Sequence, residues 1–199
     1  MWALVESGSV TKVYSRPRPL SIGDVNYPSN IFSMWTSSEL EAIGIYGVVV
    51  DNTNLKGGEY YINTDQTFTF ASGTVTATYG TASAKLIADT LYTAEEEAAD
   101  ATHVEGEAKS RGLKYIHKET INSEAAGILG QTDWYSIRAA DGGTAVPSNV
   151  ATHRAAVRTK ANAMQVQIDG AANVDALAAL YVYNDATPPV RPLGEFPTL

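Results

Sequence analysis

The 199-residue chain has no cysteine, which excludes disulfide bonds, thiol catalysis and thiolate metal sites. Basic side chains are few, with 14 Lys and Arg against 22 Asp and Glu, giving a formal net charge of -8. Because nucleic-acid binding depends largely on clustered Lys and Arg, this balance argues against a nucleic-acid partner. No stretch approaches the roughly 18 apolar residues that span a bilayer. The first residues show no secretory signal, so we expect no membrane insertion and a protein made in a cytoplasm.

Motifs of catalytic and metal sites are also missing. The three histidines, His103, His117 and His153, are scattered, and no pair has metal-ligand spacing. No nucleophile elbow, Walker loop or dinucleotide-binding glycine motif occurs. Carboxylates gather at Glu95, Glu96 and Glu97, in a stretch that is expected to be solvated. We therefore predict a protein that is not an enzyme and needs no metal or cofactor.

The chain has two halves that differ in residue types and in the spacing of apolar residues. Residues 1–80 have the pattern of β-strands. Apolar stretches on either side of a Ser-Gly-Ser turn predict a hairpin in residues 2–14. The β-branched stretch 45–51 is the best candidate for a central strand. Alternation in residues 66–79 around Gly73 predicts a second hairpin.

One short helix is expected inside this β region. Thr36 and Glu39 have the spacing of a capping box, in which each side chain bonds the other residue's backbone N–H. Gly44 would follow the end of about two helical turns. Pro17 and Pro19 cannot donate to a β-ladder, so their segment should be a sheet edge or a connection.

Beyond residue 80 the pattern changes to a helical period. Residues 81–104 are expected to form a short helix and a solvated acidic linker, and 105–185 a helical domain. Its first long helix should run from about 105 to 129, with an apolar stripe that includes Ile116. Residues 186–199 are Pro-rich and should be a docked or disordered tail.

The second long helix is marked more clearly. Pro147 suits a first helical turn, and apolar residues follow at spacings of three, four and seven. Such a narrow stripe predicts packing against one partner helix, in this chain or in another copy. A third, short helix is expected at 173–181. The stripe consists of Val150, Val157, Ala161, Met164 and Ile168.

Together these features predict an α+β fold: an N-terminal antiparallel β domain with one short helix, followed by a C-terminal helical hairpin or small bundle. Exposed tyrosines and amides on a β scaffold would also suit a glycan-binding module, with Tyr60 and Tyr61 as contacts. The alternative is that these tyrosines only cover the faces of a sheet.

Residues 128–159 carry a resemblance to a known group of proteins. A helix end with Ile128 and Leu129, the motif Thr132-Asp133-Trp134, a loop, a helix started by Pro147, and Arg154 to Arg158 follow in order. This segment resembles the C-terminal region of tail-fibre assembly and tail-assembly chaperone proteins of tailed phages. The opening residues 1–17, followed by a β domain, resemble accessory proteins of phage tail modules more loosely. Where the family pattern has tyrosine, this chain has His153.

The motif also has a physical interpretation. Asp133 can cap the turn that leaves the first long helix, and Trp134 can close the helix pair as a core residue. Arg154 and Arg158 are four residues apart on one helical face and could jointly hold the Asp133 carboxylate or one of a partner. If Trp134 is a core residue, its removal should unfold the helical half. If it is an interface anchor, its removal should weaken partner binding and leave the helices intact.

The resemblance implies a viral structural or chaperone-like protein of a bacteriophage tail. It would bind a tail-fibre or baseplate protein, and other copies of the chain are further candidate partners. It would act in the virion tail, in the host cytoplasm during assembly, or in both. The residues expected to anchor a partner or the structure are Asp133, Trp134, Arg154, Val157, Arg158 and Met164.

Overall fold

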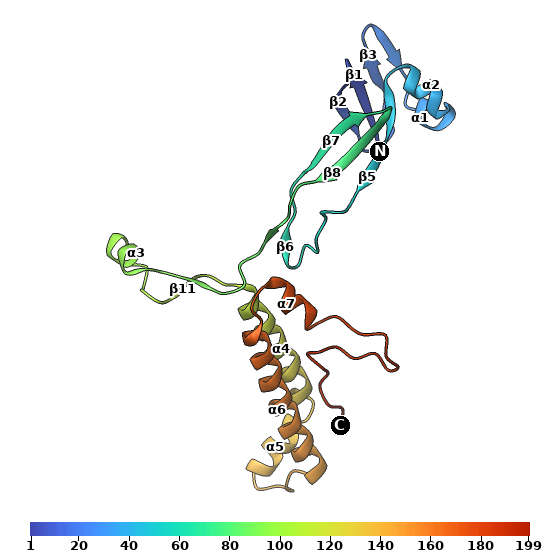
Figure 1. Cartoon of the computed structure of the whole chain (residues 1–199). Helices are drawn as coiled ribbons and strands as arrows, with labels where there is room; N and C mark the ends of the chain where they lie inside the picture. Colours follow the sequence, from blue (N-terminus) through green and yellow to red (C-terminus); the bar gives the residue numbers. More distant parts are fainter. The chain divides into compact units, whose positions relative to one another are not determined.

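A computed structural model describes all residues, 1–199, and divides into two compact units, Met1–Ser83 and Ala84–Leu199. The first unit is mainly β and the second mainly helical, so the predicted α+β class is confirmed (Figure 1). None of its helices is long and apolar enough to cross a lipid bilayer.

Unit 1 is built on a five-stranded sheet in the order β2-β1-β5-β8-β7. Its edge strands β2 and β7 approach each other, so the sheet is curled. The strands are β1 (Trp2–Glu6), β2 (Ser9–Tyr14), β3 (Leu20–Ile22), β4 (Val25–Tyr27), β5 (Ile45–Asp51), β6 (Tyr61–Ile62), β7 (Gln66–Ala71) and β8 (Thr74–Tyr79), with β9 (Ser83–Ala84) at the unit boundary.

Both predicted hairpins form, since β1 pairs with β2 and β7 with β8, each antiparallel. The predicted central strand β5 lies in the middle of the sheet. It pairs antiparallel with β1 through its first residues and parallel with β8 from Val48 to Asp51. The sheet is therefore mixed rather than wholly antiparallel, because β6 and β7 intervene in sequence and return the chain in the same direction as β5.

Two short helices, not one, interrupt the sheet: α1 (Ile31–Met34) and α2 (Ser37–Ala42). The Pro17–Pro19 segment is a connection, as predicted. The helices cover an apolar core in which the Trp2 and Phe32 rings lie 4.7 Å apart. Its buried members are Leu4, Tyr14, Leu20, Ile31, Phe32, Leu40 and Ile45.

The capping box predicted at the start of α2 is present. The Glu39 N–H donates to the Thr36 hydroxyl at 3.3 Å, and the Thr36 N–H donates to the Glu39 carboxylate at 2.7 Å. We expect Thr36→Ala to lower the free energy of unfolding of unit 1 by about 1 kcal/mol. The Glu39 N–H would lose the hydroxyl that accepts its hydrogen bond, and the Glu39 carboxylate would lose the hydroxyl that donates to it at 2.8 Å. Urea denaturation followed by tryptophan fluorescence measures this. Ser38→Ala, an exposed substitution in the same helix, should leave stability unchanged; an equal loss in both variants would contradict the prediction.

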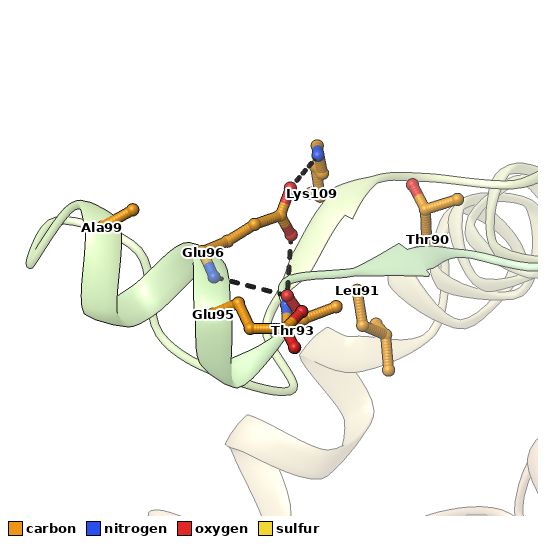
Figure 2. A pocket seen from close by; sticks show the side chains of 7 residues that line it. All are labelled: Thr90, Leu91, Thr93, Glu95, Glu96, Ala99 and Lys109. Atoms are coloured by element: carbon orange, nitrogen blue, oxygen red, sulfur yellow. Dashed lines mark hydrogen bonds and ion pairs between the residues drawn. The ribbon is translucent and has the colours of Figure 1, made fainter.

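Unit 2 begins with a β arm. The short helix predicted within 81–104 is present, but its position and the predicted start of the long helix were wrong. The acidic run forms the helix instead of a linker, Leu86 lies outside any helix or strand, and Leu91 lies in a strand. A capping box between Thr93 and Glu96 starts this helix, and an ion pair between Glu96 and Lys109 joins it to the following strand (Figure 2). The arm consists of β10 (Thr90–Leu91), α3 (Ala94–Ala99) and β11 (Ala108–Ser110).

The first long helix, α4 (Leu113–Gly130), begins eight residues later than predicted. Gly112 sets this boundary, because its N–H donates to the Asp89 carboxylate at 2.8 Å. A β-carbon at Gly112 would lie 2.4 Å from the backbone of Ala88, so only glycine fits here. This hydrogen bond and the Arg111 guanidinium hold the pKa of Asp89 below its usual value.

The remaining helices are α5 (Asp133–Ala140), α6 (Ser148–Gly170) and α7 (Val174–Ala179). The predicted α6 stripe is confirmed, since all five apolar positions are buried, and α6 packs on α4.

On α4 the buried stripe differs from the predicted one by one residue. Ile116 is 51% exposed, and His117 takes the buried position. The His117 Nδ1 lies 2.8 Å from the Tyr181 hydroxyl, which provides the polar partner that burial requires.

The C-terminal segment is docked, one of the two predicted outcomes. Leu193 is fully buried, and its carbonyl accepts a hydrogen bond from the Lys160 ammonium at 2.8 Å. Its N–H donates to the Leu180 carbonyl at 3.0 Å. The segment therefore belongs to the packing of unit 2.

Candidate interaction surface on helix α5

Helix α5, between the two long helices, presents large apolar side chains to solvent. None of its eight residues is buried. Trp134 is 50% exposed and Ile137 is 61% exposed. Scattered apolar residues are normal on protein surfaces, but a tryptophan and an isoleucine one helical turn apart form a local patch. We call Trp134, Tyr135, Ile137 and Arg138 the α5 surface.

The aromatic part of the α5 surface is ordered by stacking. The rings of Trp134 and Tyr135 are 3.7 Å apart between centroids. The Arg138 guanidinium lies 4.9 Å from the Trp134 ring and 5.3 Å from the Tyr135 ring. Such cation–π contacts fix the direction of an otherwise flexible side chain. The surface therefore combines flat apolar rings with a positioned positive charge.

The glycine-rich loop after α5 also contacts the Arg138 side chain, in addition to the two aromatic rings. Gly142 has φ +81°, a left-handed conformation that favours glycine. A β-carbon on Gly143 would lie 2.9 Å from the Arg138 Cγ and equally close to its carbonyl oxygen. The Arg138 Nε donates to the Thr144 carbonyl at 3.3 Å. The loop thus turns tightly enough to pack its backbone on the arginine stem.

A buried arginine anchors α5 to the helix pair. Arg154, on α6, is 9% exposed. It donates at 2.7 Å to each of three acceptors, the Leu129 carbonyl, the Thr132 hydroxyl and the Asp133 carboxylate. The Leu129 carbonyl lies in the last turn of α4 and also accepts from the Thr132 N–H and hydroxyl. Arg154 therefore adds a charged donor to the end of α4 while it holds the start of α5.

The structure separates the predicted anchor residues into different roles. Arg154 binds Asp133, whereas Arg158 is exposed and makes no bond to that carboxylate. Val157 and Met164 are fully buried in the α4–α6 seam and stabilise the helix pair rather than offering a surface.

The prediction that Trp134 is a core residue was wrong. Arg154, not the tryptophan, closes the junction between the helices, and the Trp134 ring is left half exposed on Tyr135. The reason lies in the helix start: α5 begins at Asp133, and the polar contact to Arg154 uses the side of α5 that faces the helix pair. The exposed position of Trp134 is compatible with the other prediction, that this side chain anchors a partner protein.

Tyr60 and Tyr61, the predicted glycan contacts, lie near a loop that is stabilised by hydrogen bonds of asparagine side chains. Tyr60 and Tyr61 are half-buried, and the Lys56 ammonium lies 5.8 Å from the Tyr61 ring. The Asn63 amide exchanges two hydrogen bonds with the Lys56 backbone, at 2.9 and 2.8 Å. The Asn54 amide donates to the Tyr79 carbonyl at 2.9 Å. These amides are engaged within the fold, so no specific observation favours sugar binding here.

The histidines and carboxylates form no cluster of three or more that could hold a metal ion. His103 stacks on Tyr92 in the arm, with ring centroids 4.1 Å apart, and His117 is bonded to Tyr181. The hollow shown in Figure 2 is lined by arm residues, and the Glu96 carboxylate within it is already bonded to Thr93 and Lys109.

Sequence reasoning found Trp134 but missed its companions Ile137 and Arg138. Their spacings, three and four residues, place them on the same helical face as the tryptophan. This spacing is informative only if residues 133–140 form a helix, and a loop was predicted after the Thr132-Asp133-Trp134 motif. No protein-family model, no curated protein and no solved structure matches this chain.

Proposed function

We propose that the chain is a non-enzymatic protein of a bacteriophage tail that binds a tail-fibre or baseplate component through the α5 surface. The observation that carries the proposal is Trp134: a large aromatic side chain, 50% exposed, on a helix that is fixed to the fold by a buried arginine. Energetically dominant interface residues are most often Trp, Tyr and Arg, and the α5 surface contains all three. The resemblance of residues 128–159 supplies the tail context.

Rigidity supports a binding role for this surface. Ordering flexible side chains on binding costs about 0.5–1.5 kcal/mol each. In the α5 surface the Trp134, Tyr135 and Arg138 side chains already stack on one another before any partner arrives. A surface that is ordered in the free protein keeps more of its contact energy as affinity.

The test is a binding measurement with Trp134→Ala. We expect at least a 30-fold loss of affinity, about 2 kcal/mol, for a tail-fibre or baseplate protein encoded beside this chain in its phage genome. The free energy of unfolding should stay within about 0.5 kcal/mol of wild type, because the ring is half exposed. Co-purification identifies the partner, calorimetry gives its affinity, and circular dichroism checks the fold.

Val166→Ala is the matched control, since Val166 is 71% exposed on α6 outside the α5 surface. It should bind as wild type does. Recovery of no fibre or baseplate protein, or equal affinities of the Trp134→Ala and wild-type chains, would count against the proposal. Mass spectrometry of purified virions then separates a permanent tail component, present in stoichiometric amount, from a chaperone released after assembly.

A further inference from the structure

The α5 surface contains a cation with no acidic partner. Arg138 uses its Nε on the Thr144 carbonyl, and its two terminal nitrogens make no hydrogen bond or salt bridge within the chain. Three other arginines lie over a tyrosine ring: Arg18, over Tyr14, has no salt bridge either, but Arg111 and Arg191 do. Arg111 also binds the Asp89 carboxylate at 2.6 Å, and Arg191 binds Glu195 at 2.8 Å.

The acidic residues nearest in sequence do not supply that partner. Asp141, the C-cap residue of α5, forms no salt bridge with Arg138. Asp133 is bound to Arg154 at 2.7 Å, and that arginine is held in place by two further acceptors. The positive charge of Arg138 is therefore left beside exposed apolar rings in a chain whose net charge is -8. This arrangement is complementary to an acidic group on an incoming molecule.

The geometry of Arg138 also limits which acidic group fits. A planar guanidinium with free terminal N–H groups matches the two oxygens of a carboxylate, and stacking on rings keeps that plane fixed. Phosphate has similar acceptor chemistry, but a nucleic acid would bring many phosphates toward a strongly acidic chain. Charge complementarity thus favours a carboxylate carried by a protein.

We propose that Arg138 recognises an Asp or Glu side chain of the tail partner, set next to an apolar residue of that partner that covers Trp134 and Ile137. The proposal rests on the function proposed above and names the chemistry of the docking segment. Arg138 is a specificity-determining residue in this arrangement: the rings supply apolar contact, and the guanidinium selects an acidic segment over neutral or basic ones.

The test compares variants of Arg138 in the full chain, with the fibre or baseplate protein recovered by co-purification as the probe. We expect Arg138→Glu to weaken binding at least 100-fold through like-charge repulsion, and Arg138→Lys to weaken it about 10-fold because the ammonium lacks the planar fork. Arg158→Glu makes the same charge change at an exposed site on α6 and should alter affinity less than threefold. Wild-type affinity should fall as sodium chloride rises, and that of Arg138→Gln should respond less.

A second step identifies the acceptor. Charge reversal of the correct Asp or Glu on the tail protein should restore binding to the Arg138→Glu chain and to no other variant. If Arg138→Glu and Arg138→Lys bind as wild type does while Trp134→Ala does not, the carboxylate proposal is overturned and the proposed function stands. If Trp134→Ala also binds normally, the proposed function fails as well. Arg138-dependent binding of a 12-nucleotide single-stranded DNA, without any effect on the tail protein, would overturn it in favour of phosphate.

Discussion

Replacing Arg154 by alanine is expected to lower the free energy of unfolding of unit 2 by about 3 kcal/mol. The contact to Asp133 contributes the smaller share, because that carboxylate side chain is 54% exposed and water would replace its partner. Most of the loss comes from the bond to the Thr132 hydroxyl, because the Leu129 carbonyl keeps the Thr132 N–H and hydroxyl as donors, each at 3.0 Å. Thr132 is 5% exposed, so its hydroxyl would lose its charged donor in a place where water reaches it poorly.

Urea denaturation followed at 222 nm measures this effect, since α4 and α6 dominate the helical signal. Arg158→Ala removes an identical side chain one turn further along α6, where it is exposed. That variant should remain within about 0.5 kcal/mol of wild type. If both variants lose the same stability, the three hydrogen bonds of Arg154 do not hold the helix junction together.

The second large effect is expected for Met164→Ala, which should cost about 3 kcal/mol. Met164 is fully buried on the α6 face that packs on α4, and alanine would leave a cavity where the thioether chain now fills the seam. Two helices share few core residues, so neighbours have little freedom to collapse into the space.

Val166→Ala is the natural comparison for Met164→Ala, because the valine lies two residues away and is 71% exposed. Its replacement should be neutral or slightly stabilising, since alanine has the higher helix propensity. Thermal unfolding by circular dichroism should therefore lower the midpoint for Met164→Ala alone. A midpoint for Met164→Ala equal to that of Val166→Ala would show that the seam is not the main support of unit 2.

Structural features set by residues close together in sequence were predicted correctly, and a feature set by residues far apart was not. The capping box at Thr36, the β1–β2 and β7–β8 hairpins and the buried stripe of α6 were all predicted, because each depends on residues within a turn or a helical period. The start of α4 was missed, since it is set by a carboxylate 23 residues away in sequence. Local periodicity continues through Gly106 and Gly112 without indicating a break.

The candidate site was predicted only in part for the same reason. The Trp134 motif and the Arg154–Arg158 pair stand out in the sequence, but their surroundings do not. Whether a tryptophan is covered depends on which side of its helix faces the rest of the fold. Here that side is fixed by three hydrogen bonds from Arg154, across 21 to 25 residues of chain.

Composition and short-range pattern are enough to predict the β-then-helical order of the chain, its acidic character, its hairpins and caps, and the stripe along α6, because propensity, periodicity and turn chemistry act over a few residues. Three features could be seen only in the folded chain: β5 runs parallel to β8, His117 is buried while Ile116 is exposed, and Arg138 lies on the Trp134 ring without an acidic partner. Those features arise from contacts between residues distant in sequence or from the direction a helical face takes. Such choices are made by the competition for burial and hydrogen bonds across the whole unit, which no local pattern encodes.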